Sequence, residues 1–402
     1  MPAASRPAFT APFWIASTVN LLCLTGGSTF VLLPLYLERH GFHRWEIGLV
    51  AGSFSLMAVF SRPWVGERLD RRGRRPLFLA GAVLLGLLTF AFMAAPPSVP
   101  ILMALRASQG LAMACYFTAI WTWTADYAPP GRMAEVLGLF GISGLVAGAA
   151  GPVLAELLAA RGSFLPVFGV GGGLMLGAAW LALRLEEQRP RPLAEPPRSP
   201  GFWRLSLSPG LLGLTLVSLA FGGSTATFQT FAAPFVASRG LAGVGLFFTA
   251  YSVASVLVRL GAGARTDRLG PGRMVAPSLA CHALGLAVFS RLGGGGPAGL
   301  PVLLAAALLA GTGHGLLYPA LSSLAVQRVG AAHRGLGVSL FTGAIEFGSF
   351  AGALTAGTLA HATGYPETFL AGALAVGAAA GLFPLLEGRA AARGEDFPCP
   401  LP

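Results

Sequence analysis

Two charged side chains lie inside long apolar stretches, where a charge is costly. Glu346 stands near the middle of one stretch, in FTGAIEFGSFAG, and Arg106 stands in another, in LMALRASQG. Because an apolar environment disfavours the ionised carboxylate, a glutamate there can take up and release a proton as its surroundings change. An arginine in a membrane span costs about 2.5 kcal/mol or more on insertion scales. Glu346 is therefore a candidate proton carrier, and Arg106 is a candidate functional residue.

Each of these residues also has a purely structural interpretation. Glu346 can be a protonated acid that is hydrogen-bonded to a neighbouring helix. Arg106 lies about two turns from the nearer end of its stretch, so its side chain can extend to the membrane surface. Glu156 lies near the end of another stretch, which favours an interfacial role. The HxxH pair of His40 and His43 lacks a third ligand, so we expect no metal site and no cofactor.

Composition indicates that water is not the main solvent of this chain. Its 402 residues are 54% hydrophobic and only 11% charged, whereas about 25% of the residues of a soluble domain are charged. A bilayer core about 30 Å thick needs roughly 20 apolar residues per helix. The sequence has twelve such stretches, so we predict an all-α membrane protein with twelve transmembrane helices. They lie near residues 11–36, 46–65, 76–95, 99–125, 133–159, 164–184, 208–236, 243–264, 273–291, 299–327, 335–360 and 366–386.

Arginine placement gives the predicted spans an orientation. All 27 basic residues are arginines, and 19 of them fall in segments on the side of the N-terminus, against five on the other side. Because cytoplasmic loops carry the excess of arginine, both termini are predicted to be cytoplasmic in a multi-pass protein of the bacterial inner membrane. The net charge of +11 is then a topology signal, and we expect the lipid bilayer rather than nucleic acid as partner.

The chain divides almost in half at a polar segment. Residues 185–207 contain five prolines and mixed charges, which is typical of a stiff, solvated linker. We predict an N-terminal six-helix bundle over residues 1–184, a C-terminal bundle over residues 208–386 and a cytoplasmic tail over residues 387–402.

The two halves contain the same sequence pattern. SRPWVGERLDRRG, which begins at Ser61, aligns with VRLGAGARTDRLG, which begins at Val258, at an offset of 197 residues. A match of this length in equivalent spans indicates that the halves are homologous. We therefore predict two pseudo-symmetric bundles. The identical positions are Arg62, Gly66, Arg68, Asp70, Arg71 and Gly73, which fall on Arg259, Gly263, Arg265, Asp267, Arg268 and Gly270.

GERLDRRGRR, at residues 66–75, closely resembles the G-x-x-x-D-R-x-G-R-R loop of the major facilitator superfamily. The resemblance covers nearly the whole chain and implies the major facilitator fold. It also implies a cytoplasmic gate that breaks and re-forms as the two halves rock. The alternative interpretation is an arginine-rich inner loop that only fixes topology. The implied gate residues are Gly66, Arg68, Asp70, Arg71, Gly73, Arg74 and Arg75, with Gly263, Asp267 and Arg268 in the second copy.

Two further segments resemble motifs of the same family. LMALRASQG resembles L-x-x-x-R-x-x-q-G, whose arginine is linked to proton coupling, and this implies a coupling role for Arg106. LGLFGISGLVAGAAGP resembles the glycine-rich motif of the antiporter branch, although Ala147 stands where a glycine is usual. Close helix packing alone also accounts for these glycines. Many drug–proton antiporters place an acid in the first span, where this chain has Asn20, so their mechanism does not transfer simply.

Substrate contacts are implied by the same resemblance. In this family the first, fourth, seventh and tenth spans face the cavity. Aromatic residues on these spans can equally well be packed or face lipid. The candidates are Asn20, Thr25, Phe30, Trp121, Trp123, Thr227, Gln229, His314 and Tyr318.

The function that these features favour is secondary transport. GxxxxGK[ST] does not occur, which argues against ATP-driven transport by this chain. The segment GTGHGLLYPALSSLAVQRVGAAHRGLGVSLFTGAIEF, together with SRPWVGERLD earlier in the chain, resembles the bacterial arabinose-efflux-like and drug–proton antiporter branch. Our hypothesis is a monomeric, proton-coupled exporter of a small organic compound, with Glu346 and Arg106 as coupling residues. The alternative is an importer or facilitator of a small metabolite, such as a sugar or an organic acid. A membrane enzyme would need a clustered catalytic set in a loop, and we expect none.

Overall fold

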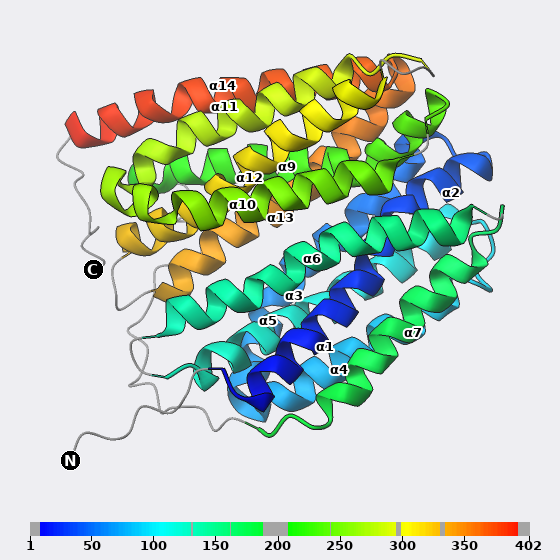
Figure 1. Ribbon diagram of the computed structural model, residues 1–402, viewed down its shortest axis with the longest axis horizontal. Coiled ribbons are helices and arrows are strands. Elements are labelled where there is room, and N and C mark those ends of the chain that lie inside the picture. Colours follow the sequence, from blue (N-terminus) through cyan, green and yellow to red (C-terminus); the bar gives the residue numbers. More distant parts are fainter. Residues whose placement is uncertain are drawn as a thin grey trace. The chain divides into compact units, whose positions relative to one another are not determined.

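The computed structural model describes residues 9–129, 132–160, 162–187, 208–241, 243–294, 299–329 and 334–392. All regular secondary structure in these ranges is helical (Figure 1). The first half contains α1 (Ala11–Ser28), the 3-10 turn η1 (Thr29–Leu32), α2 (Leu33–Arg39), α3 (Arg44–Arg72), α4 (Arg74–Ala91), α5 (Val99–Tyr127), α6 (Met133–Ala159) and α7 (Leu165–Ala182). The second half contains α9 (Pro209–Ser238), α10 (Val244–Leu269), α11 (Pro271–Ser290), α12 (Gly299–Val329), α13 (Arg334–Ala362) and α14 (Tyr365–Ala392).

These helices confirm the twelve predicted spans. The first span consists of α1, η1 and α2, and each other helix corresponds to one predicted stretch. Ten of the twelve are long and apolar enough to cross a membrane by length and composition alone. The other two are α3 and α5, whose mean hydropathy is lowered by polar residues that include Arg62 and Arg106. Several helices carry proline in the first turn, where no backbone N–H is needed.

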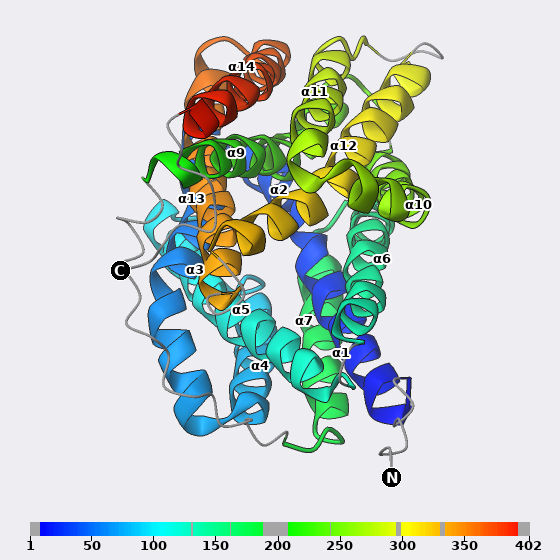
Figure 2. The ribbon, with the colours of Figure 1, turned by 90° about the vertical axis from the view of Figure 1, so that its left-hand side faces the viewer.

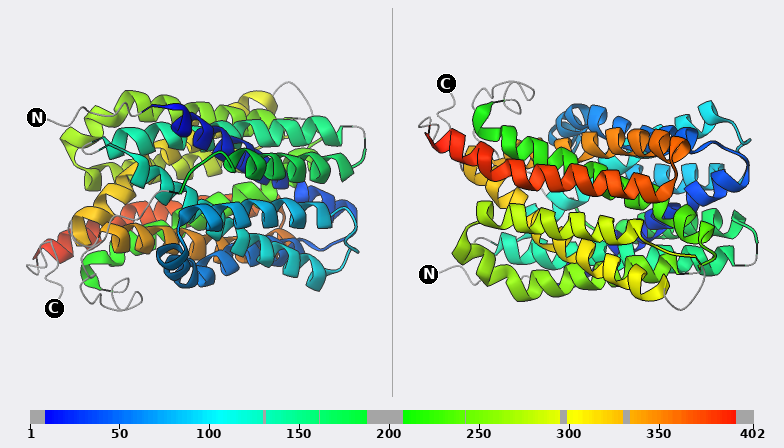
Figure 3. Two further views of the ribbon diagram at one scale, coloured as in Figure 1. Left: turned by 90° about the horizontal axis from the view of Figure 1, so that it is seen from below. Right: turned by 90° about the horizontal axis from the view of Figure 1, so that it is seen from above.

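The helices form two compact units with the same internal packing. One unit comprises Met1–His40 and Ser53–Ala194, and the other comprises Gly41–Gly52 and Glu195–Pro402. In the first unit, α1 packs against α6 and α7, and α4 packs against α5 and α7 (Figure 2). In the second unit, α9 packs against α13 and α14, and α11 packs against α12 and α14 (Figure 3). The four helix pairs correspond one to one, as expected of homologous halves.

Close contacts at glycines repeat between the units. A Cβ atom on Gly110 of α5 would collide with the carbonyl oxygen of Phe54 in α3. A Cβ atom on Gly311 of α12 would collide in the same way with the carbonyl oxygen of Tyr251 in α10. Phe54 and Tyr251 are 197 residues apart, which is the offset of the sequence repeat. The repeat therefore extends to the way in which the backbones of the helices meet.

The two copies of the loop pattern end in the same backbone conformation. Gly73 has φ +86° and Gly270 has φ +83°, in the left-handed region that glycine adopts without a steric penalty. Each glycine ends one helix and immediately precedes the next, α4 or α11. Pro271 and Gly272 replace the arginine pair in the second copy. The second copy therefore keeps the glycine turn but not the arginine pair that follows it in the first copy.

The first span is not a continuous α-helix, and the last span is longer than predicted. The 3-10 turn η1 interrupts the first span just before Pro34, which has no backbone N–H to donate. The hydroxyl of Thr29 donates to the carbonyl of Gly26 at 2.7 Å, so this polar group is satisfied within the span. At the other end, α14 continues to Ala392, past residue 386 where the sequence predicted the bundle to end. An ion pair of Glu387 with Arg328 stabilises this extension.

Gly222 offers a test of the close α9–α13 contact. A Cβ atom on Gly222 would collide with the carbonyl oxygen of Ile345, so Gly222→Ala should destabilise the protein by about 1–3 kcal/mol through overpacking. Thermal unfolding of the purified protein in detergent measures the effect. Gly173→Ala is the matched control, because a Cβ atom on this α7 residue meets no atom within 4 Å. Equal melting temperatures for the two variants would contradict the prediction.

Candidate functional site

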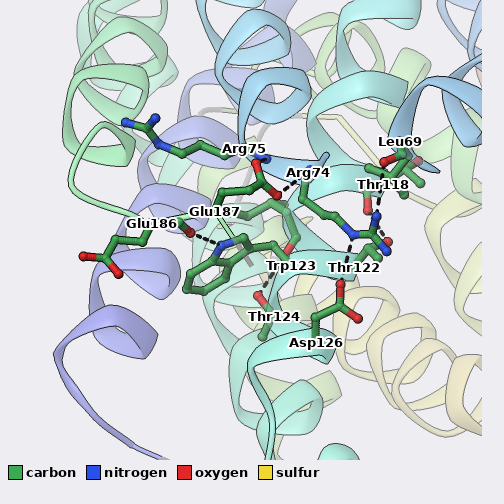
Figure 4. A network of polar contacts seen from close by, with 11 residues as sticks. Leu69, Arg74, Arg75, Thr118, Thr122, Trp123, Thr124, Asp126, Glu186 and Glu187 are labelled. Atoms are coloured by element: carbon green, nitrogen blue, oxygen red, sulfur yellow. Dashed lines mark hydrogen bonds and ion pairs between the residues drawn. The ribbon is translucent and has the colours of Figure 1, made fainter. Parts of the chain in front are cut away.

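Arg74 ties together three helix ends in the first unit. It is the first residue of α4 and only 5% exposed. Its Nε donates to a carboxylate oxygen of Asp126 at 2.9 Å, near the end of α5, and its Nη1 donates to the carbonyl of Leu69 in α3 at 3.1 Å (Figure 4). A buried guanidinium that is paired with a carboxylate and also hydrogen-bonded is well compensated. The ends of α3, α4 and α5 are therefore held together by this charged side chain and its hydrogen bonds.

Glu187 fixes the end of the sixth span to the same place. Its two carboxylate oxygens accept the backbone N–H groups of Arg74 at 2.9 Å and Arg75 at 2.8 Å. These N–H groups belong to the first turn of α4, where a carboxylate also compensates the positive end of the helix dipole. Gly73 leaves the space, because a Cβ atom there would lie 2.9 Å from the carboxylate carbon of Glu187. The indole N–H of Trp123 donates to the carbonyl of Glu186 at 2.8 Å beside this contact (Figure 4).

Only part of the predicted gate enters this network. Gly73, Arg74 and Arg75 belong to it. Arg68 instead lies over the ring of Trp64, 4.6 Å from its centroid. Arg71 forms an exposed ion pair with Glu67, and Gly66 has no atom within 4 Å of a Cβ position. The side-chain positions of Asp70, Gly263, Asp267 and Arg268 lie outside the described part of the chain.

The sequence analysis did not single out Asp126, which pairs with the Arg74 guanidinium, or Glu187, which accepts backbone N–H groups at the start of α4. The available signal was their position, since each acid ends an apolar stretch on the arginine-rich side. The first residues of the predicted linker thus belong to the packed first unit.

In the second unit, an ion pair of different residues joins the ends of helices. Arg328, near the end of α12, is 5% exposed and pairs with Glu387 of α14. Its Nη1 also donates to the carbonyl of Gly210 in α9 at 2.9 Å. In both units one buried arginine links the ends of several helices. The arginine stands on different helices in the two halves, so the sequence repeat did not reveal the second pair.

Asn20 joins three helices inside the first unit. The side chain is fully buried, and its amide nitrogen donates to the hydroxyl of Ser143 in α6 at 2.8 Å. Its amide oxygen accepts the hydroxyl of Tyr116 in α5 at 3.3 Å. An amide satisfied in this way fixes α1 against α5 and α6 without a charge.

Arg106 is contacted by three neutral side chains of the first unit. Its Nη1 donates to the amide oxygen of Gln109 at 2.9 Å, three residues further into α5. Gln109 in turn donates to the hydroxyl of Thr89 in α4 at 3.1 Å. The guanidinium carbon also lies 4.5 Å from the ring centroid of Phe54 and 5.1 Å from that of Phe30. These contacts hold the guanidinium among neutral side chains of the first unit.

Glu346 lies on a face of α13 that packs against protein. The side chain is half-buried. Ala353 and Gly357 follow it at i+7 and i+11, on the same helix face. Both contact Gly48 of α3, where a Cβ atom would lie 2.5 Å from the carbonyl oxygen of Ala353. On the adjacent face, the hydroxyl of Ser349 donates to the carbonyl of Gly222 in α9 at 3.1 Å. Glu346 therefore does not belong to a lipid-facing stripe.

A tyrosine–histidine cluster occupies the second unit. The hydroxyl of Tyr251 and Nδ1 of His314 are 2.6 Å apart. The ring of Tyr318 lies 6.4 Å from that of His314 and 5.9 Å from the guanidinium of Arg259. Arg259 donates from Nε to the carbonyl of Gly315 at 3.2 Å. The structure thus brings the predicted residues His314 and Tyr318 together with two residues that the sequence analysis did not choose.

The other predicted cavity residues are placed less uniformly. Gln229 is exposed, and Trp121 is half-buried. Trp123 is fully buried and stacks on Tyr127, so it has no surface for a ligand in this conformation. Thr25, Phe30 and Thr227 are buried as well.

Together these observations define a polytopic α-helical membrane protein built from two homologous halves. The sequence pattern of the Major Facilitator Superfamily matches residues 13–244 and, in a second match, residues 216–396. The chain belongs to the Major Facilitator Superfamily.

Similar proteins span nearly the same length. An uncharacterised MFS-type transporter of Burkholderia mallei (strain SAVP1) is 30% identical over 406 residues, which cover 96% of this chain and 95% of the relative. Another from Salmonella typhimurium is 28% identical over 378 residues, which cover 89% and 92% of the two chains. These relatives are transporters rather than enzymes.

Solved structures share the fold. The nucleoside transporter NupG superimposes with a TM-score of 0.71 at 16% identity, covering 94% of this chain and 99% of that one. A bacterial homologue of the human lysosomal transporter Spinster, inward-facing and unoccupied, gives a TM-score of 0.75 at 15% identity, with 95% and 98% coverage. Likeness at this identity establishes the architecture alone.

Arg74→Gln tests the charge pair that closes the first unit. It leaves Asp126 without its cation, and because the Asp126 side chain is 25% exposed, we expect a loss of about 2–3 kcal/mol rather than the full cost of a buried charge. Arg71→Gln is the control, since its pair with Glu67 is exposed and should contribute less than about 0.5 kcal/mol. Thermal unfolding in detergent measures both. Equal stability of the two variants would show that the Arg74 pair does not hold the helix ends.

Proposed function

We propose that this superfamily transporter is a proton-coupled exporter of a small organic compound, with Glu346 as the proton carrier. The observation that carries the proposal is a half-buried carboxyl in mid-span, on a protein-facing stripe of α13. Such a group is protonated or ionised according to its surroundings. Ionisable residues inside membrane spans mark proton and substrate paths.

Alternating access follows from the construction of the halves. Each unit ties its own helix ends with a buried arginine, Arg74 in one and Arg328 in the other. Units that are braced internally can move as bodies, which is how transporters built from repeats alternate their access. The gate that would lock one state is the loop 66–75 together with Gly263, Asp267 and Arg268 of the second copy.

The excess of arginine supports a cytoplasmic location for the ends that carry these pairs and for both termini. We place the protein, as a monomer, in the bacterial inner membrane. In α6, a Cβ atom on Gly151 would lie 2.8 Å from the carbonyl oxygen of Thr25 in α1. Close packing explains this glycine, so the support for export comes from the resemblance of the segment to the antiporter motif.

Glu346→Gln tests the proton carrier. A glutamine keeps the size of the side chain but cannot release a proton, so coupled transport should fall to background. Inside-out membrane vesicles with an acidified lumen provide the measurement. A transported compound, found by screening sugars, amphipathic cations and organic anions, should make the lumen more alkaline in the wild type and not in the variant.

Glu156→Gln is the matched control, because it removes another half-buried carboxyl in a span of the first half. It should retain the lumen response. Undiminished proton flux in Glu346→Gln would exclude this residue as the carrier. Transport without any change of lumen pH in the wild type would favour the importer or facilitator.

Asp70→Asn tests the gate. Loss of this carboxylate should weaken the closed cytoplasmic side and raise the labelling rate of cysteines introduced near that end. Glu67→Gln removes a neighbouring exposed acid from the same helix and should leave labelling unchanged. If the two variants label and transport alike, the loop fixes topology only.

A further inference from the structure

We propose that Arg106 forms an anion-binding subsite in the first unit, which takes the carboxylate or phosphate group of the transported compound. The inference rests on the proposed function as a transporter of small organic compounds and names the class of substrate. It deepens the coupling role of Arg106, because it assigns what the guanidinium binds.

The first observation is a free edge on the guanidinium. Nη1 is used by Gln109, at 2.9 Å. Nε is buried and has no hydrogen-bond partner among the described residues. Within the same ranges Nη2 has none either, and no carboxylate pairs with Arg106. Nε and Nη2 form the fork that binds carboxylate and phosphate oxygens in a bidentate manner.

The neighbours hold this fork in place but do not neutralise it. Gln109 is 1% exposed and is itself bonded to Thr89, so the contact that orients Nη1 is fixed from α4. The rings of Phe30 and Phe54 attract the cation through their faces. All of these partners are neutral. Among the residues that the structure describes, this charge in a membrane span therefore has no counter-ion, and an anionic ligand would supply one.

The second observation concerns the first span. Phe30 belongs to the 3-10 turn η1, the one interruption of that span within the described residues. The irregular turn thus contacts the uncompensated arginine. Interrupted transmembrane helices typically form the substrate sites of secondary transporters, where they can rearrange around the ligand. The interruption of the first span and the unbonded side of the guanidinium therefore lie at the same place.

The arrangement also selects against cations. A positive group near Arg106 would meet an unneutralised charge in a medium of low dielectric, where like charges repel strongly. A neutral compound would leave the Nε and Nη2 fork unsatisfied. An organic anion satisfies the charge and the hydrogen bonds together.

Ligand-induced thermal stabilisation tests the subsite in purified full-length protein. Sodium benzoate and inorganic phosphate are titrated in neutral detergent, with benzamide as the uncharged match and sodium chloride to hold the ionic strength constant. We expect a saturable rise in melting temperature with at least one anion and none with benzamide. Arg106→Gln should raise the dissociation constant about tenfold or more. An equal response to benzoate and benzamide, or no response to any anion, would overturn the proposal.

Arg39→Gln is the matched control in the same unit. Arg39 also lies over a phenyl ring, that of Phe164 at 5.3 Å, but it is exposed at the end of α2. This variant should bind the anion as tightly as the wild type. Unchanged binding by Arg106→Gln would overturn the proposal, as would an equal loss of binding in Arg39→Gln.

Gln109→Glu provides a second variant in case Arg106→Gln does not fold. It places a carboxylate where the amide oxygen now lies 2.9 Å from Nη1, so the arginine gains an internal counter-ion. The anion response should disappear while the protein remains monodisperse. An arginine that serves only packing would leave the response of this variant unchanged, and that result would overturn the subsite.

Two further comparisons separate the possible explanations. Stabilisation by phosphatidylglycerol in the micelles, without any response to soluble anions, would assign the site to a lipid headgroup and overturn the substrate assignment. If a neutral compound moves protons while no anion binds, the subsite is wrong and the exporter stands. If anions bind through Arg106 but no compound moves protons, the subsite stands and the coupling is wrong.

Discussion

Helices in a bilayer gain little from leaving the lipid for each other, so close backbone contact has to hold this protein together. Glycines make that contact possible beside both candidate coupling residues. Gly110 lets α5 approach α3 at Phe54, and this sets the ring that lies against Arg106. Gly222 lets α9 approach α13 at Ile345, directly before Glu346. The two candidate coupling residues are thus positioned by glycines that carry no chemistry themselves.

Charge is handled differently at the ends of the spans and inside them. At the ends, Arg74 and Arg328 are paired with carboxylates and bonded to carbonyl groups. Inside the described spans, Arg106 and Arg259 have only neutral partners, an amide in one case and a carbonyl in the other. A paired charge stabilises an architecture, whereas a charge with neutral partners remains available to a ligand. This division separates the residues that brace each unit from those, such as Arg106, for which we propose a role in transport.

The sequence was sufficient to predict the spans and the repeat, because the length of an apolar stretch and a 197-residue offset depend only on the order of residues along the chain. It did not reveal which side chains meet. The sequence analysis named neither Asp126 nor Glu187, and the structure places both around Arg74. Trp123 was a cavity candidate from its span alone, with packing as the equal alternative, and the structure buries it completely. Helical periodicity defines a face, but the neighbour of that face depends on packing between distant segments.

In each half, one carboxylate fastens the last span to its own unit. These two contacts bear on whether the chain can be cut between the halves. Glu187 bonds within the first unit and Glu387 within the second, and neither of these contacts uses residues 188–207. A segment that these contacts do not require acts chiefly as a tether, which keeps one half at high local concentration near the other. Its length should therefore be adjustable over a wide range. Separately synthesised halves would each keep the carboxylate contact that fastens their own last span.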